Sequence, residues 1–167
     1  MTLRPIAIAC IAAGLIACGE KTEIHHADGH KAKTCAEDGG VSINDAWVRA
    51  TPSASGMSAA FFTVCNGGGE AVDVVSVTTP VAGVTELHET TRSAEGVVAM
   101  QPVSNVSIAA GDSAAFEPGG KHVMLTQLNG AIEDGAEVPI TVTLTDGVTI
   151  DVVAKAKSPA KAAGHNH

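Results

Sequence analysis

The sequence contains very few aromatic residues: three phenylalanines, one tryptophan and no tyrosine among 167 residues. A hydrophobic core must therefore be built mainly from Val, Ile, Leu and Ala. Basic residues are also scarce, because ten Lys and Arg face 18 Asp and Glu, which gives a formal net charge of -8. Nucleic-acid binding depends on neutralising phosphates with Lys and Arg, so this balance argues against a nucleic-acid partner. An acidic surface instead attracts cations.

The motifs of common enzyme classes are also missing. The sequence has no nucleophile motif, no phosphate-binding glycine loop before a helix, and no His/Asp/Glu cluster with the spacing of a hydrolytic zinc site. We therefore interpret the chain as a binding protein and not as an enzyme.

The N-terminus carries a short apolar run, Ile6 to Ala17, after the basic residue Arg4. This run is too short to span a bilayer and is typical of a signal peptide, predicted here as residues 1–17. It ends in "LIAC", which resembles the lipobox of bacterial lipoproteins. The resemblance implies cleavage before Cys18, a lipid on its sulfur, and a membrane-anchored protein in the periplasm. The alternative is an ordinary secretory signal, which also takes the protein out of the cytoplasm.

Four cysteines are present, but only two remain for the folded part of the mature chain. Cys10 leaves with the signal peptide and Cys18 would be lipidated, so Cys35 and Cys65 remain. In an oxidising compartment two cysteines most simply form a disulfide, and we predict this pairing. The alternative is two buried or reactive thiols.

Most histidines lie in polar segments at the two ends, a tether over residues 18–40 and a tail over residues 155–167. These five are His25, His26, His30, His165 and His167. Imidazoles in flexible segments can collect metal ions without a preformed cage, so they form a candidate secondary metal site. Solvated polar filler is the alternative.

Between these segments, residues 41–154 consist of short runs rich in Val, Ile and Thr that are separated by Gly, Pro, Asn and Asp. Asp146-Gly147 joins the last two runs and predicts a tight hairpin. No helical periodicity extends over a useful length. The pattern predicts one all-β domain of eight or nine strands, a β-sandwich or Greek-key barrel, with a monomer as the default state.

Two His/Met pairs stand out in this domain. His122 and Met124 are two residues apart in "GGKHVMLTQL", so on a strand they leave the same face. His88 and Met100 lie in a predicted hairpin, and a turn centred on Ala94 would place them directly opposite each other, with Cβ atoms about 5 Å apart. Imidazole and thioether suit the soft ion Cu(I), whereas thioether is a poor ligand for Zn, Ca or Mg. The alternative is that the methionines pack in the core.

Three other residues of the domain are not interpreted as ligands. Met57, before an apolar run, is expected to pack or to act as a lid. Glu86 and Glu89 flank His88 and are expected to face away from it, toward solvent.

Several segments, taken in order, resemble the periplasmic copper chaperones called PCuAC. They are "AW" followed by "R", then "FFTVCN", "ELHE", "VVAM", "PGGKHVML" and "VTIDV", and they cover residues 41–153. The 21 residues between Met100 and His122 match the family motif. The 11 between His88 and Met100 are one more than usual, and we place the extra residue in the turn at Ser93 to Gly96.

The resemblance implies a cupredoxin-like β-sandwich that binds one Cu(I) through His88, Met100, His122 and Met124 at an exposed end. It further implies copper delivery to subunit II of cytochrome c oxidase, together with a thiol-bearing assembly protein. Histidine tails in some relatives add a Cu(II) site, a role that His165 and His167 could fill.

Other binding functions remain open at this point. A blue-copper electron carrier needs a cysteine thiolate beside two histidines, and Cys65 precedes the first candidate ligand instead of following it. A lipid-tethered β-sandwich interaction module, or a copper-buffering protein without a specific acceptor, would also fit the composition.

Overall fold

The computed structural model describes residues 39–54, 56–94 and 96–158, and the structural statements below concern these ranges. They form ten strands and contain no helix that could cross a membrane. The strands are β1 (Val41–Arg49), β2 (Ser58–Asn66), β3 (Val72–Thr78), β4 (Ala82–Arg92), β5 (Val98–Pro102), β6 (Val106–Ile108), β7 (Ser113–Phe116), β8 (Lys121–Leu128), β9 (Glu137–Leu144) and β10 (Thr149–Lys157). The predicted all-β class is confirmed, with slightly more strands than expected.

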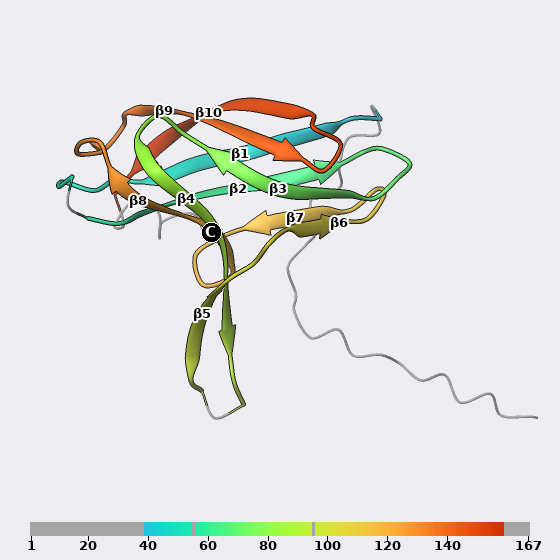
Figure 1. Ribbon diagram of the computed structural model, residues 1–167, viewed down its shortest axis with the longest axis horizontal. Helices are drawn as coiled ribbons and strands as arrows, with labels where there is room; N and C mark the ends of the chain where they lie inside the picture. Colours follow the sequence, from blue (N-terminus) through green and yellow to red (C-terminus); the bar gives the residue numbers. More distant parts are fainter. Residues whose placement is uncertain (1–38, 55, 95, 159–167) are drawn as a thin grey trace, which may run out of the picture. The chain divides into compact units, whose positions relative to one another are not determined.

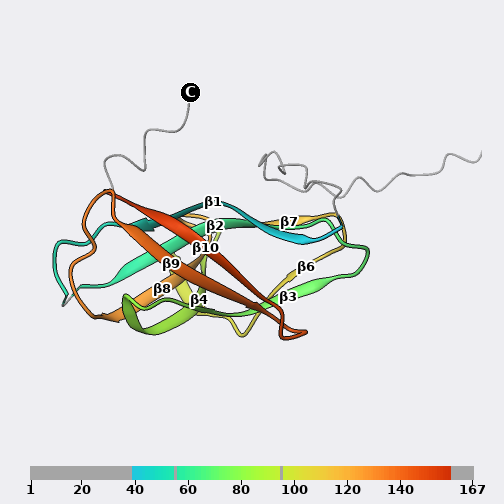
Figure 2. The same ribbon diagram turned by 90° about the horizontal axis from the view of Figure 1, so that it is seen from above.

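The strands form one sheet in the order β5-β4-β8-β7-β2-β1-β10-β9-β3-β6, and β8 also pairs with β2. Most neighbours are antiparallel, whereas β1 runs parallel to β10. Seen from above, β1, β2 and β7 lie along one side and β3 and β4 along the other (Figure 2). The sheet thus folds over on itself, and aliphatic side chains fill the space between its two sides.

The core is mostly aliphatic, as the composition requires. Val48, Val64, Val123 and Val142 are among its fully buried members, and Phe62 stacks on Phe116 with ring centroids 4.6 Å apart. These side chains alternate along their strands with residues of the outer face, which is the period-2 pattern of a strand. The core therefore defines an opposite, outer face on β2 and β8, and the candidate ligands lie there.

The C-terminal hairpin forms where the sequence predicts it. Leu144 and Val148 close the turn by a backbone hydrogen bond of 2.9 Å, and Gly147 has φ +83°, a conformation that Asp-Gly turns favour. Strand β10 continues to Lys157, three residues past the predicted domain end at 154. The first three residues of the predicted tail, 155–157, therefore belong to this strand.

The hairpin of β4 and β5 extends away from the rest of the sheet (Figure 1). Its register differs from the prediction, because Met100 pairs with Thr90 and His88 pairs with Pro102. The cause is the turn: Ser93 bonds to Val97, and a glycine at position 96 with φ +83° moves the centre of the turn one residue beyond Ala94. A shift of two residues keeps every side chain on its face of the sheet.

Several predicted features fall outside the described residues. These are Cys18, Cys35, His25, His26, His30, His165 and His167. Cys65 is buried in β2. The lipidation, the disulfide and the secondary metal site therefore stay predictions.

Candidate metal centre

The centre of the site is a pair of histidines on neighbouring strands. His88 in β4 lies directly opposite His122 in β8, and their ring centroids are 5.8 Å apart. Residues that are directly opposite in an antiparallel pair point to the same face. Metal–imidazole bonds are about 2 Å long, so one ion between the rings can reach a nitrogen of each. The sequence identified both histidines but not their pairing with each other.

The His88 ring is held without the hydrogen bonds that a buried imidazole normally makes. Both of its nitrogens are buried, and neither has a hydrogen-bond partner among the described residues. The Glu86 carboxylate lies close by, with its Oε2 3.6 Å from Nε2, which is too long for a good hydrogen bond. Buried polar atoms are rarely left unpaired, so these nitrogens fit a ligand that the protein chain does not supply.

The His122 ring, in contrast, is oriented by the backbone. It is 5% exposed, and its Nδ1 lies 3.0 Å from the Gly120 carbonyl oxygen. An oxygen acceptor at this position requires Nδ1–H to donate, and in the neutral imidazole this leaves the lone pair on Nε2. Fixing the tautomer through the other ring nitrogen is the usual way in which proteins prepare a metal-binding histidine.

Two methionines complete the group that we call the His/Met set: His88, Met100, His122 and Met124. Met100 pairs with Thr90, which lies two residues from His88 and so shares its face. Met100 is 51% exposed, and Met124 is half-buried. All four side chains therefore leave the same, outer face of the sheet.

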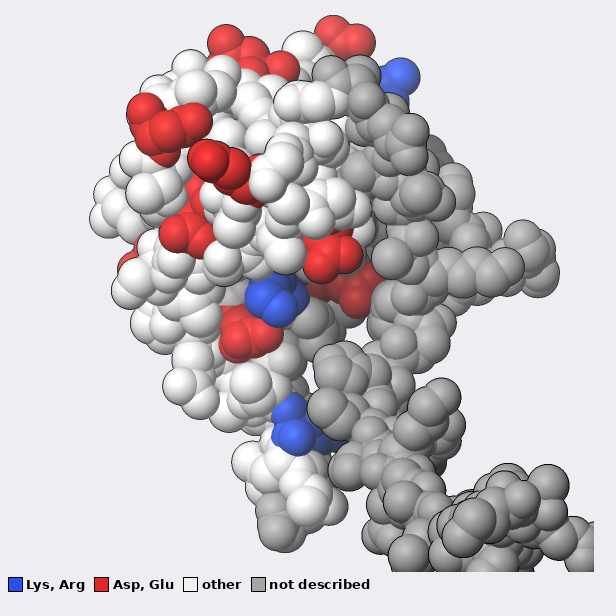
Figure 3. All heavy atoms as spheres, turned by 90° about the vertical axis from the view of Figure 1, so that its right-hand side faces the viewer, with Lys and Arg blue, Asp and Glu red and all other residues white. Residues whose placement is uncertain are grey.

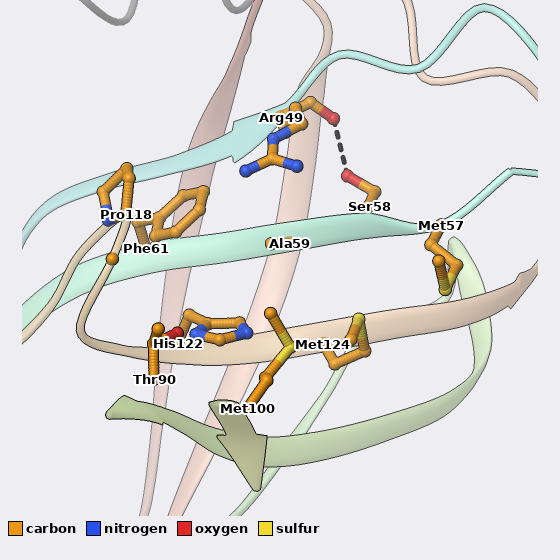
Figure 4. A pocket seen from close by; sticks show the side chains of 11 residues that line it. Arg49, Met57, Ser58, Ala59, Phe61, Thr90, Met100, Pro118, His122 and Met124 are labelled. Carbon is orange, nitrogen blue, oxygen red and sulfur yellow. Dashed lines mark hydrogen bonds between the residues drawn. The ribbon is translucent and has the colours of Figure 1, made fainter. Parts of the chain in front are cut away.

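Three members of the set line a pocket of about 280 Å³ on this face, namely Met100, His122 and Met124. Figure 4 shows these side chains beside one another along the pocket. His88 is outside this lining, on β4 directly opposite His122. Within the described residues, no three His, Cys, Asp or Glu side chains form a group that could hold a metal.

Aromatic and basic side chains form the other side of the pocket. The Phe61 ring lies next to the His122 ring, with their centroids 6.4 Å apart. On Phe61 stacks Trp47, at a centroid distance of 4.3 Å. The guanidinium of Arg49 lies 5.8 Å from the centre of the Phe61 ring and also lines the pocket. Phe61 is 1% exposed although it belongs to the outer face. This apolar layer limits the access of water to the inner end of the site.

One interpretation made from the sequence is wrong, and another is narrowed. Glu86 does not face away from His88, because residues at i and i+2 of a strand share a face, and it lies opposite Met124. Of the two roles expected for Met57, packing is excluded because the residue is 66% exposed, whereas a lid stays open because Met57 lines the same pocket as Met100 and Met124. No local signal in the sequence predicts its position, which depends on the pairing of β2 with β8.

The surface around the fold is acidic. Figure 3 shows a face on which Asp and Glu side chains are spread over the described residues while Lys and Arg are few. Lys121 forms an ion pair with Glu89 at 3.0 Å next to the site. The excess of acidic groups raises the local concentration of cations.

Comparison with known proteins places the chain in a family. Residues 41–156 match the family described as "Putative lipoprotein LpqE-like". The chain belongs to the LpqE-like family. A relative from Leifsonia xyli subsp. xyli (strain CTCB07), named "Putative lipoprotein Lxx21020", is 32% identical over 155 residues, which cover 93% of this chain and 89% of the relative. The lipoprotein character predicted from the N-terminus agrees with both.

Solved structures confirm the resemblance to PCuAC. The solution structure of Cu(I)-bound DR1885 from Deinococcus radiodurans is 30% identical and has a TM-score of 0.58, covering 78% of this chain and 83% of that one. The copper-bound PCuAC domain from PmoF2 has a TM-score of 0.60 at 16% identity, covering 72% and 95%. The second likeness concerns the fold alone. The DR1885 structure was solved with Cu(I) bound, in agreement with the interpretation of the chain as a binding protein.

Proposed function

We propose that this protein is an extracytoplasmic Cu(I) chaperone and that the His/Met set holds the ion. The observation that carries the proposal is the His88–His122 pair, directly opposed on β4 and β8 and flanked by two thioethers on the same face. The unpaired, buried nitrogens of His88 add support, because a metal ion would satisfy them. The Cu(I)-bound state of DR1885, a relative with the same fold, supports copper as the cargo.

The donor set favours Cu(I) over other metal ions. Thioethers are soft ligands that select Cu(I) and bind Zn, Ca or Mg poorly. Outside the cytoplasm they have a further advantage over thiols, since two thioethers cannot close into a disulfide and destroy the site. All four ligands are neutral, so copper can leave without the protonation of any ligand at neutral pH.

The exposure of the site suits transfer to a partner. Met100 is 51% exposed on a hairpin that extends from the sheet, whereas His122 is 5% exposed (Figure 1). A partner can therefore replace the outer thioether first and the imidazoles last. Thiolates bind Cu(I) more strongly than thioethers do, so stepwise exchange moves the ion toward an acceptor that carries cysteines.

We propose that the acceptor is the dinuclear copper site of cytochrome c oxidase subunit II. A thiol-bearing assembly protein takes part in this delivery. The resemblance to PCuAC supports this choice. A lipid on Cys18 would hold the chaperone at the periplasmic face of a membrane, where that site is assembled. The histidines of the two ends would add a secondary site for Cu(II).

The test is a Cu(I) titration against a chromophoric chelator, using residues 39–158, which contain all ten strands but none of the terminal histidines. We expect one ion per chain. His88→Ala and Met124→Leu should each weaken binding strongly, whereas Val153→Leu, an exposed substitution on β10, should not. If the chain does not compete with the chelator, the proposal is wrong, and the tethered interaction module becomes the better interpretation. Binding without transfer to subunit II would instead indicate copper buffering.

A further inference from the structure

We infer that Met57 is a third thioether ligand, which Cu(I) meets as it enters and leaves the site. The inference rests on the proposed function and goes beyond it, because neither the family motif nor the sequence pattern assigns a role to Met57. Copper is first held by the sulfurs of Met57, Met100 and Met124, which we call the outer arrangement, and His88 binds it afterwards.

The strand pairing carries the first step of the argument. Met57 directly precedes β2, and Ala59, two residues later, lies opposite Met124 in β8. With the same alternation, Met57 shares the face of Ala59 and lies diagonal to Met124. Diagonal neighbours in an antiparallel pair have Cα atoms about 7–8 Å apart, which two long side chains can bridge.

The small side chain of Ala59 leaves this space open. Ala59 is the residue between Met57 and Phe61 on the outer face, and all three line the pocket. The backbone is anchored just after Met57, because the Ser58 hydroxyl donates a 2.6 Å hydrogen bond to the Arg49 carbonyl. Figure 4 shows this bond and places Met57 beyond Met124, at the end of the pocket away from His122.

The exposure of the side chains gives the order in which an ion meets them. Met57 is 66% exposed and Met100 51%, whereas His122 is 5% exposed. A methionine that is mostly in water gains little from packing, so burial does not explain Met57. The pocket thus offers three thioethers and one imidazole, whereas His88, whose nitrogens are buried, is not part of its lining.

The exchange step balances without a co-reactant. A lone pair on the Met57 sulfur forms a Cu–S bond while the bond from copper to a His88 nitrogen breaks, and copper stays Cu(I). No proton moves, because thioether and imidazole are both neutral. In the reverse direction the same step takes an arriving ion from the outer arrangement into the His/Met set.

The experiment uses the mature chain with 13C-labelled methionine methyl groups. The sequence has four methionines, and removal of the signal peptide leaves Met57, Met100 and Met124, so three methyl signals are expected and can be assigned with single Met→Leu variants. On addition of Cu(I) we expect all three signals to shift. In the His88→Ala variant the Met57 shift should be larger than in the parent, because the outer arrangement is then the favoured one.

Transfer kinetics give a second readout. Met57→Leu keeps the apolar volume, and we expect it to slow Cu(I) transfer to a chelator by about tenfold, the factor that corresponds to one lost interaction of 1.4 kcal/mol. Val153→Leu, a similarly exposed control outside the pocket, should transfer at the parent rate. If the Met57 signal stays unchanged in both backgrounds while Met100 and Met124 shift, the inference is wrong and the proposed function stands. If no methionine signal shifts, the proposed function fails as well.

Discussion

Replacing His88 with leucine should make the metal-free protein more stable. Both His88 nitrogens are buried and lack a hydrogen-bond partner among the described residues, and a Glu86 carboxylate oxygen lies 3.6 Å from Nε2. A buried polar group left without a partner costs about 1–3 kcal/mol. Leucine fills a similar space without that cost, so we expect the free energy of unfolding to rise by about 1–3 kcal/mol.

His122→Leu is the matched control because the same chemical change should have the opposite effect. The His122 Nδ1–H donates to the Gly120 carbonyl oxygen at 3.0 Å, and this bond would be lost. The Thr90 N–H also donates to that oxygen at 3.1 Å, so the carbonyl keeps one partner. The loss should therefore lower stability by about 1 kcal/mol.

Urea unfolding measured by fluorescence gives both values, because Trp47 is the only tryptophan and stacks on Phe61 beside the site. Adding Cu(I) should raise the midpoint of the parent protein more than that of either variant, since a ligand stabilises the folded state in proportion to how tightly it binds. The reasoning is refuted if His88→Leu is no more stable than the parent, or if the two variants change stability in the same direction.

Three further predictions concern the thioethers, the neighbouring carboxylate and the fold. Met100→Leu with Met124→Leu should abolish chelator-competitive Cu(I) binding while changing the unfolding free energy by less than about 1.5 kcal/mol; retained affinity would contradict the assignment. Glu86→Gln should lower Cu(I) affinity about fivefold in the same titration, because the Glu86 carboxylate lies 3.6 Å from His88 Nε2 and a unit charge at about 4 Å contributes about 1 kcal/mol in water-like surroundings; an unchanged affinity would show that Glu86 does not act on the ion. Asn66→Ala should lower the free energy of unfolding in urea by about 3 kcal/mol. The reason is that the buried Asn66 amide nitrogen lies within hydrogen-bond distance of three carbonyl oxygens, including that of Ile108 at 3.2 Å. A loss below about 1 kcal/mol would contradict this role.

Local patterns predicted much of the fold. Runs of β-branched residues between turn residues mark most of the strands, and Asp146-Gly147 forms the turn expected of it. The same-face relation of His122 and Met124 also follows from the two-residue period of a strand. These features depend on a few neighbouring residues, so the sequence alone can predict them.

The arrangement of the site depends on contacts between distant segments. His88 and His122 meet because β4 pairs with β8, and Met57 reaches Met124 because β2 pairs with the same strand. No local pattern specifies those pairings or their register. Even the short β4–β5 hairpin was misplaced by two residues, because one glycine with positive φ in the turn sets the pairing. The Glu86 error was different, since the two-residue period already predicts that it shares a face with His88.

X-ray absorption at the copper edge tests the central claim most directly. The sample is the Cu(I)-loaded 39–158 segment, compared with its Met100→Leu/Met124→Leu variant. The account predicts a first shell that contains both imidazole nitrogen and thioether sulfur in the parent, and a loss of most of the sulfur signal in the variant. A shell of only nitrogen and oxygen in the parent protein would contradict it.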